Sequence, residues 1–382
     1  MLLSSDHNNF ADPPNFLYWF WFFGYLCACV ILAVFKLYLL PSSYKSRNFT
    51  HNSTASTHAP NFKCIWSVVD NRTKCKPVCG HGYFGLYGME ACHPWLDCDE
   101  LKSINGSEKI PLSTPGSVKQ VRISKWEGYD VVVKKLRDYH IGRRAHTEYK
   151  HGLQILKDFS NHSEVLQLVG FCDSVMVTEF HALADANNLE KHLMVYKDFD
   201  NVSTRFQLCL DFLYIMTLLH SGQGGKVYAH CDGNAVSILL WQFLLTDDFR
   251  LVISDVDALV DLEILNGVTQ KKVCPVESRN YSVPFNAPEQ HWPYKEEPFN
   301  ISRMPPYDEK IDIWKIPDVC KSFLHYMPLK IKILPHLRDI NNRCKSKDPQ
   351  TRPKASEVLA VYRDVHRHLI GNGSTILSLH HT

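Results

Sequence analysis

Two short acidic stretches hold the residues best suited to chemistry in this 382-residue chain. The first, HCDGN, contains Asp232 and Asn234, and the second, SDVD, contains Asp255 and Asp257. A carboxylate can accept a proton from a hydroxyl group, and carboxylate and amide oxygens are ligands that a hard divalent cation accepts. Because burying an unpaired carboxylate is costly, packing alone gives no reason for acids at these positions. The pattern indicates proton transfer and metal binding.

Residues 230–257 resemble the catalytic segment of the protein-kinase fold, in which an HRDLKPENILL loop precedes a β-hairpin and a metal-binding DFG triplet. His230, Cys231 and Asp232 match the first three positions of that loop, and Asp255 falls where the DFG aspartate would be. The resemblance implies that Asp232 is the catalytic base and that Asp255 is a metal ligand.

Further kinase-like motifs follow in the expected order. The string NAPEQ contains an APE triplet that ends at Glu289, and YDEKIDIWKIPDV places Asp312 like the aspartate of a DxW motif. SKDPQTRPKASEVL supplies Arg352, the usual partner of the APE glutamate. Upstream, VTEF resembles the nucleotide-binding hinge and contributes Glu179 and Phe180. Together with the segment at 230–257 these make five motifs in order over about 180 residues, which favours a kinase fold.

The phosphate-binding parts are altered. Phosphoryl transfer needs a backbone cradle over the nucleotide phosphates and a lysine on their oxygens. The glycine loop keeps only Gly116 of its three glycines, and Lys119 occupies the third glycine position. Lys134 stands at the usual lysine position of the following strand, so either lysine could meet the phosphates. The helical glutamate that pairs with this lysine aligns at Gly152, and Glu148 lies one turn earlier on the same face.

The metal-binding parts are altered as well. The usual asparagine ligand falls at Ser237, and Asn234 is the closest amide able to replace it. The DFG triplet becomes Asp255-Val256-Asp257, in which Asp257 offers a second carboxylate. A non-catalytic pseudokinase is therefore a rival hypothesis, although the retained Asp232 and Asp255 argue against it.

The elements that must position these residues follow from the hydrophobic pattern. The runs SVKQVRISKW and DVVVKKL turn around Glu127-Gly128 and predict a hairpin. Apolar residues at helical spacing predict helices within 143–159, 206–220 and 355–369, and VLQLVGF and VMVTEF predict strands. We therefore expect an α+β, bilobal protein-kinase-like fold, with a β-rich small lobe followed by a helical large lobe.

An apolar segment near the N-terminus predicts a membrane anchor. Positions 16–35 are uncharged, and the apolar run resumes to residue 40, which is long enough to span a hydrocarbon core of roughly 30 Å. Basic residues after the segment favour a cytosolic C-terminus. Nine N-glycosylation sequons, against roughly two expected by chance, favour a lumenal body instead, and we follow them. The sequons are at Asn48, Asn52, Asn71, Asn105, Asn161, Asn201, Asn280, Asn300 and Asn372.

The 13 cysteines agree with a secretory compartment. Five of them, within residues 64–98, indicate a disulfide-linked cap, and we expect some of Cys79, Cys92 and Cys98 to form disulfides that close the cap on itself or pin it to the small lobe. A zinc site is the less favoured alternative, because the spacings lack two short ligand pairs. The scattered later cysteines are expected to be buried small hydrophobes; they are Cys172, Cys209, Cys231, Cys274, Cys320 and Cys344.

Composition limits the other possibilities. The chain is 45% apolar and 12% aromatic, which excludes collagen, coiled coil and a disordered polyelectrolyte. Its net charge of +2 gives no reason to expect nucleic acid as a partner. The organisation we expect is a cytosolic tail at 1–15, a transmembrane anchor at 16–40, a flexible lumenal stalk at 41–75, an atypical kinase-like domain at 76–370 and a tail at 371–382.

One family shows the same pattern of losses. Over about residues 76–366 the chain resembles the protein O-mannose kinase family in its cysteine segment, its CD catalytic dipeptide, a DxDAL in place of DFG, and the strings APEQxWPY and YDEKIDIWKIPD. The single N-terminal anchor is also similar to that of the family. The resemblance implies ATP with Mg²⁺ or Mn²⁺, and transfer to the 6-hydroxyl of O-linked mannose in a GalNAc-GlcNAc-Man trisaccharide on a glycoprotein such as dystroglycan. It also implies a single-pass type II protein of the endoplasmic reticulum or Golgi membrane. The rival interpretations are a secretory protein Ser/Thr kinase and a non-catalytic glycan-binding scaffold.

Overall fold

The computed structural model describes residues 61–104, 110–111, 118–137, 143–231, 233–265, 268–274, 283–294, 296–324 and 330–371. All of them belong to one compact unit with the bounds Ala59 and Thr382. The predicted anchor at 16–40 lies outside the described residues, and so do Gly116 of the glycine loop and the predicted base Asp232.

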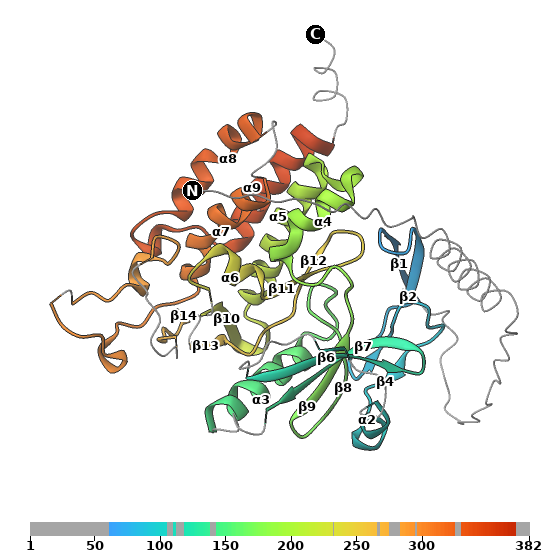
Figure 1. Ribbon diagram of the computed structural model, residues 1–382. Coiled ribbons are helices and arrows are strands. Elements are labelled where there is room, and N and C mark those ends of the chain that lie inside the picture. Colours follow the sequence, from blue (N-terminus) through green and yellow to red (C-terminus); the bar gives the residue numbers. More distant parts are fainter. Residues whose placement is uncertain are drawn as a thin grey trace, which may run out of the picture. The chain divides into compact units, whose positions relative to one another are not determined.

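The small lobe is built on a five-stranded antiparallel sheet in the order β5-β6-β7-β9-β8 (Figure 1). A two-residue turn joins β6 to β7, and Glu127 (φ 47°) and Gly128 (φ 90°) both have positive φ, as a tight hairpin turn with the strands' own twist requires. This confirms the predicted hairpin. The strands are β5 (Ile110–Pro111), β6 (Lys119–Trp126), β7 (Tyr129–Leu136), β8 (Leu168–Cys172) and β9 (Val175–Glu179).

A cap of short elements covers one face of this sheet. Phe84, Leu96 and Leu101 of the cap pack against Val131 and Val133 of β7 in one apolar cluster. The cap consists of β1 (Phe62–Ser67), β2 (Arg72–Pro77), β3 (Tyr83–Phe84), β4 (His93–Pro94) and α2 (Cys98–Ile104). Strands β1 and β2 form a hairpin at 62–77, which overlaps the end of the flexible stalk expected at 41–75.

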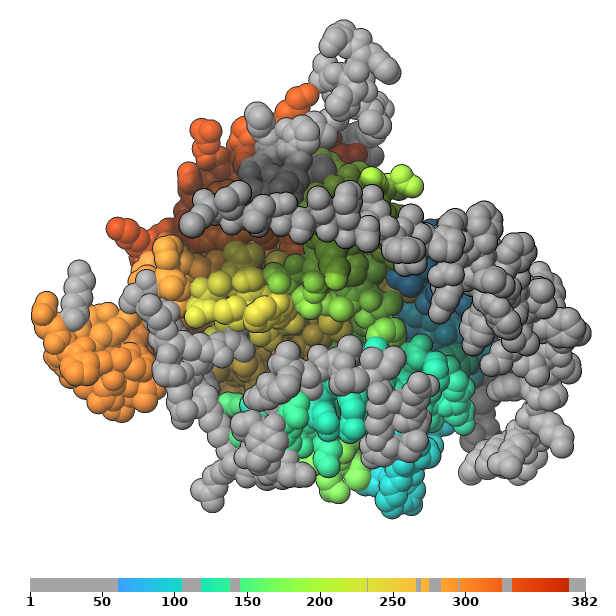
Figure 2. Space-filling model, viewed as in Figure 1, coloured from blue at the N-terminus to red at the C-terminus, as the bar shows by residue number. Residues whose placement is uncertain are grey.

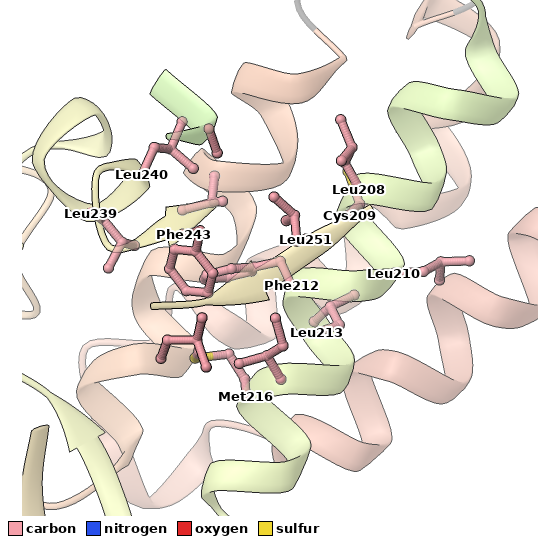
Figure 3. Packing of buried hydrophobic residues seen from close by; sticks show 14 of the residues in the cluster. Leu208, Cys209, Leu210, Phe212, Leu213, Met216, Leu239, Leu240, Phe243 and Leu251 are labelled. Atoms are coloured by element: carbon pink, nitrogen blue, oxygen red, sulfur yellow. The ribbon is translucent and has the colours of Figure 1, made fainter. Parts of the chain in front are cut away.

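The large lobe is mainly helical and surrounds α5 (Val202–Leu219). Asn201 caps α5, because its side chain accepts a hydrogen bond from the Thr204 N–H (3.0 Å). In Figure 3, apolar side chains of α5 such as Phe212 and Met216 meet Phe243 and Leu251 from the neighbouring hairpin. The other helices are α3 (Arg143–Asp158) of the small lobe and α4 (Leu189–Val195), α6 (Val236–Leu240), α7 (Lys310–Phe323), α8 (Lys330–Cys344) and α9 (Ala355–His366) of the large lobe.

Among the described residues, α5 alone is long and apolar enough to cross a membrane. About two thirds of it (67%) is buried inside the protein. A buried core helix of a globular lobe can be as long and as apolar as a membrane span. The apolar character of α5 is therefore weak evidence for a membrane span.

Short antiparallel strands complete the large lobe. They form a sheet in the order β10-β13-β14 and a separate hairpin of β11 and β12. Their bounds are β10 (Lys226–His230), β11 (Phe243–Leu245), β12 (Leu251–Ile253), β13 (Leu259–Leu265) and β14 (Val268–Thr269). A β-sheet lobe followed by a helical lobe fits the kinase-like fold that the motifs predict.

Four disulfides link eight of the eleven described cysteines, and they confirm part of the prediction. Cys79–Cys92 closes the cap on itself, and Cys98–Cys172 pins it to β8 of the sheet. The others are Cys64–Cys75 and Cys231–Cys274. The expectation of lone buried thiols was wrong for Cys172, Cys231 and Cys274, because spacing along the chain does not reveal which cysteines meet in the fold. The expectation is confirmed for Cys209, Cys320 and Cys344, whose thiols are free and buried.

Figure 2 shows one segment, coloured orange, that projects from the large lobe. Within it the described residues from Pro293 to Arg303 are all exposed. The segment follows the APE triplet in the chain.

Candidate active site

The predicted catalytic loop is held at its start by α7. Asp312 Oδ2 accepts a hydrogen bond from the His230 backbone N–H (2.9 Å), and Lys315 Nζ donates to the His230 carbonyl oxygen (3.1 Å). The His230 ring stacks on Phe243 at 5.7 Å between centroids. Burial lowers the pKa of His230 to about 4, so the ring is neutral at pH 7 and acts as a packing group. Asp232 follows two residues later and lies outside the described residues.

A disulfide ties this loop to the segment after β14. Cys231, directly before Asp232, is bonded to Cys274, 43 residues further along the chain. A covalent link next to the predicted base restricts the positions that the loop and the following segment can adopt. Beyond Asp232, Gly233 is buried against Leu239, and Asn234 is half-buried before α6.

Lys119 joins the small lobe to the altered DFG segment. Its Nζ lies 3.0 Å from Asp255 Oδ1 and 2.6 Å from Asp257 Oδ2. Lys134 reaches the same segment, where its Nζ donates to the Ser254 carbonyl oxygen (3.3 Å). The structure thus brings together two lysines and two acids that sequence reasoning singled out.

Burial and proximity shift the pKa values of these four groups in different directions. Partial burial alone would raise the pKa of Asp255, but Lys119 and Lys134 hold it below its ordinary value. Burial raises the pKa of Asp257, and the Asp255 carboxylate adds to this effect although Lys119 opposes it. Burial opposes charge on Lys119, yet the two carboxylates raise its pKa. Burial lowers the pKa of Lys134 to about 8, and the charge of Lys119 adds to the shift.

Gly152 of α3 leaves room for the Asp257 side chain. A Cβ at Gly152 would lie 2.1 Å from Asp257 Oδ1 and 2.9 Å from its Cγ, distances at which atoms overlap. The usual kinase arrangement has a glutamate at this helical position and a glycine at the DFG end. Here the acid has moved from the helix to the end of the triplet, and Lys119 pairs with it there. Glu148, the substitute partner that the sequence suggested, lies one turn earlier on α3.

Glu179 and Phe180 lie where β9 leaves the small lobe. The Glu179 carboxylate is buried, with its Oε2 2.6 Å from Lys76 Nζ and its Oε1 accepting from the Gln167 N–H (3.1 Å). His181 Nε2 lies 3.4 Å from the same oxygen, Oε1. The Glu179 side chain is therefore engaged within the protein, and Phe180 is half-buried.

The large-lobe ion pair predicted from the APE motif is present. Arg352 donates to both carboxylate oxygens of Glu289, and its Nη2 lies 2.8 Å from Oε2. The guanidinium also donates to the carbonyl oxygens of Lys310 and Ser346. This prediction is confirmed.

Comparison with known proteins identifies the family. The chain is 37% identical over 306 residues to the protein O-mannose kinase of Macaca fascicularis, which covers 78% of this chain and 82% of the relative. It is 37% identical to the human protein of that name over 294 residues and 36% identical to the Gallus gallus protein over 293 residues, each covering 75% of this chain and 80% of the relative. No protein-family model matches the chain. The chain belongs to the protein O-mannose kinase family.

In this member of the protein O-mannose kinase family, sequence reasoning missed three features of the site. It did not predict the Cys231–Cys274 disulfide or the buried contact between Lys76 and Glu179. It singled out Gly152 and Asp257 separately but did not connect them. A signal existed for that pair, because the glycine at the helical acid position coincides with an acid at the DFG glycine position.

Proposed function

We propose that this chain transfers the γ-phosphoryl group of ATP to a hydroxyl group of an O-linked mannose. Its membership of the protein O-mannose kinase family supports kinase activity on a hydroxyl acceptor. The observation that carries the proposal is the cluster of Lys119, Asp255 and Asp257. In it the ammonium group of a small-lobe lysine meets two carboxylates of the large lobe. Phosphoryl transfer depends on placing such charges around the phosphates.

On the nucleotide side, Lys119 and Lys134 supply the positive charge for the phosphate oxygens. Asp257 orients Lys119, in the role that a helical glutamate has in most kinases, with Glu148 one turn away on α3. Gly116 would let the glycine loop approach the phosphates, since a glycine adds no side chain there. We propose that the nucleobase of ATP binds at the linker that begins at Glu179 and Phe180.

The donor set suits a hard divalent cation. Kinase-type sites hold Mg²⁺ through one or two carboxylates together with substrate phosphates, so a cage of protein ligands is not required. Within the described ranges there is no group of three or more His, Cys, Asp or Glu placed to bind a metal ion. Asp255, whose side chain is 43% exposed, is the proposed carboxylate ligand, and Asn234 is the proposed amide ligand. A bound Mg²⁺ or Mn²⁺ would neutralise charge on the phosphates.

On the acceptor side, Asp232 is the proposed base. The mannose hydroxyl oxygen attacks the γ-phosphorus and forms a new P–O bond, while the bond to the β–γ bridging oxygen breaks and ADP leaves. Asp232 accepts the proton of the attacking hydroxyl. Asp312 and Lys315 support this step, since they fix the backbone of His230 two residues before the base.

We further propose that the acceptor is the 6-hydroxyl of mannose in a GalNAc-GlcNAc-Man trisaccharide on a glycoprotein such as dystroglycan. The site residues themselves do not name the sugar, so this choice rests on the family resemblance. We propose a single-pass type II protein of the endoplasmic reticulum or Golgi membrane, with the anchor at 16–40 and the catalytic domain, expected at 76–370, in the lumen.

Glycan removal tests this topology. If the nine sequons face the lumen, glycosidase treatment of the cell-expressed protein lowers its mass by several glycans. An unchanged mass contradicts the lumenal orientation.

The decisive experiment for function measures ATP consumption by the full chain with a synthetic core trisaccharide and with a peptide panel, at varied Mg²⁺ and Mn²⁺. We expect turnover with the trisaccharide only. Phosphorylation of peptides instead indicates a secretory Ser/Thr kinase. Metal-dependent ATP binding without transfer to either acceptor indicates a non-catalytic scaffold.

A further inference from the structure

Two lysines of strand β2 reach different lobes of the protein. Lys74 and Lys76 are two residues apart in an extended strand, so their side chains leave on the same face. Lys76 Nζ contacts Glu179 Oε2 (2.6 Å) at the end of the small-lobe sheet. Lys74 Nζ contacts Asp247 Oδ2 (3.0 Å) in the turn between β11 and β12 of the large lobe. One short hairpin therefore touches both sides of the junction between the lobes.

The small-lobe contact is buried. The Lys76 side chain is 15% exposed and that of Glu179 is 7% exposed. A buried carboxylate needs a cation and hydrogen-bond donors, because water no longer solvates it. Burial alone would raise the pKa of Glu179, but Lys76 and His181 hold it well below its ordinary value. Lys76 is thus a principal partner of a charged group at the point where the chain leaves the small lobe.

The large-lobe contact has several donors. Asp247 is buried, and its Oδ2 accepts from the Ser67 hydroxyl (2.9 Å) as well as from Lys74. Its carbonyl oxygen accepts from the Val68 N–H (2.9 Å). Three residues of the hairpin segment therefore hold one turn of the large lobe.

The hairpin is stiff enough to transmit these contacts. Cys64 and Cys75 face each other across β1 and β2 and are joined by a disulfide. The ring of Tyr87 lies beneath both ammonium groups, 5.7 Å from Lys74 Nζ and 5.1 Å from Lys76 Nζ. In Figure 2 the blue surface of the hairpin lies between the green surface of the large lobe and the teal surface of the small lobe.

We propose that the β1–β2 hairpin is a brace between the lobes, and that Lys76 is a positioning residue for ATP binding that acts through Glu179. The proposal rests on the proposed function, in which the nucleobase of ATP binds at the linker that follows Glu179. A ligand pocket between two lobes depends on their relative position. Lys76 does not touch ATP; it fixes the linker, while Lys74 fixes the large lobe to the same strand.

The test compares purified full-length variants. Lys76→Met keeps the length of the apolar stem and removes the charge, which leaves Glu179 buried without its lysine. We expect the KM for ATP to rise about tenfold, with kcat at saturating ATP within twofold and the KM for the glycan acceptor unchanged. Lys76→Arg keeps the cation and should return the KM for ATP to within about threefold of wild type. Lys74→Met should give a smaller rise, because Ser67 and Val68 still hold Asp247.

Lys125→Met is the matched control. Lys125 pairs with Asp130 at 2.7 Å in the small-lobe hairpin, but the two side chains are 58% and 46% exposed, so loss of this pair should change no kinetic constant. Hydrogen exchange supplies a readout that does not need activity. In Lys76→Met, the amides of residues 167 and 179–181 should exchange faster, while those of the β10–β13 pair should not.

Three outcomes overturn the brace. The first is a KM for ATP in Lys76→Met within twofold of wild type, and the second is a parallel loss of all kinetic constants with a lowered melting temperature, which indicates general unfolding. The third is failure of Lys76→Arg to restore ATP binding. If wild type shows no phosphoryl transfer, the proposed function fails separately, and the brace is then judged by the dissociation constant of ATP and by hydrogen exchange.

Discussion

The large lobe keeps the contacts of a kinase fold, whereas the phosphate-facing side of the site has rearranged them. In the large lobe, Arg352 still pairs with Glu289, and Asp312 still holds the start of the catalytic loop. On the phosphate-facing side, Lys119 from the glycine-loop position forms ion pairs with the acids of the DFG-type segment, and its partner Asp257 comes from the triplet itself.

The difference shows which requirements are geometric and which are chemical. The large-lobe contacts are buried, and each satisfies several polar groups at once, so replacing one partner leaves the others unpaired. The phosphate-facing side of the site requires only that positive and negative charges lie at the right positions around the phosphates, whichever element supplies them. Because α3 and the triplet lie against each other at Gly152, an acid from either element can reach the lysine.

The largest effect is expected from the two acids that keep their kinase positions. Asp232→Ala should lower turnover by about 10³-fold or more and leave ATP binding nearly intact, because a base contacts the acceptor and not the nucleotide. Asp255→Ala should lower turnover as strongly and also weaken metal-dependent ATP binding. Steady-state kinetics and calorimetric titration with ATP and Mg²⁺ distinguish the two. Near-normal transfer by Asp232→Ala would show that our assignment of the base is wrong.

The next largest effect is expected on stability, from the buried ion pair of the large lobe. Arg352→Met leaves Glu289 without its guanidinium partner and should reduce the free energy of unfolding by about 3–5 kcal/mol. Its KM for ATP should not change, since Arg352 lies in the scaffold. Arg343→Met is the control, because Arg343 pairs with Glu357 at 3.4 Å in an exposed setting and should contribute no more than about 1 kcal/mol. Urea denaturation measures both, and equal losses would contradict the argument.

A smaller effect is expected at the contact between α3 and the triplet. Gly152→Ala places a methyl group against Asp257 and should reduce the free energy of unfolding by about 1–3 kcal/mol. It should also raise the KM for ATP about tenfold, because Asp257 must move away from Lys119.

Two double variants separate packing from charge at this contact. Gly152→Ala with Asp257→Gly removes the overlap and should recover stability without recovering the KM for ATP. Gly152→Glu with Asp257→Gly returns the acid to the helix and should recover both. If the first double variant binds ATP like wild type, Asp257 does not orient the lysine.

Much of the fold follows from local sequence patterns. The hairpin of β6 and β7 was predictable because Glu127-Gly128 interrupts two β-branched runs, and α3 because its apolar residues recur at helical spacing. The pairing of Arg352 with Glu289 was predictable because both stand in recognisable strings. Cys231–Cys274 was not, since residues 43 apart meet only through the arrangement of the sheet.

The chemistry of the site was predictable by residue type but not by pairing. Lys119, Lys134, Asp255 and Asp257 were singled out from their positions in motifs. Whether Glu148 or Asp257 meets a lysine depends on how closely α3 approaches the triplet, and no single-sequence pattern contains that distance. The contact of Lys76 with Glu179 depends likewise on how a hairpin of the cap packs against a distant linker.

The smallest effect distinguishes the two lysines by pH. The pKa of Lys134 is lowered to about 8, so its ammonium group loses its proton as the pH rises through 8, whereas Lys119 has a raised pKa and stays charged. If Lys134 attracts the phosphates, kcat/KM for ATP should fall above pH 8 and be about tenfold lower at pH 9. Lys134→Met should remove this decline and leave a low, flat profile.

Unfolding does not explain such a decline. A lysine whose pKa is lower in the folded than in the unfolded chain destabilises the folded state while charged, so its own contribution to stability rises from pH 8 to about 10.5. The melting temperature should therefore not fall because of Lys134 over the range in which kcat/KM falls. Lys119→Met should shift the decline to higher pH, because the charge of Lys119 is one cause of the lowered pKa of Lys134. A profile that stays flat up to pH 9 in wild type would instead assign the phosphate contact to Lys119.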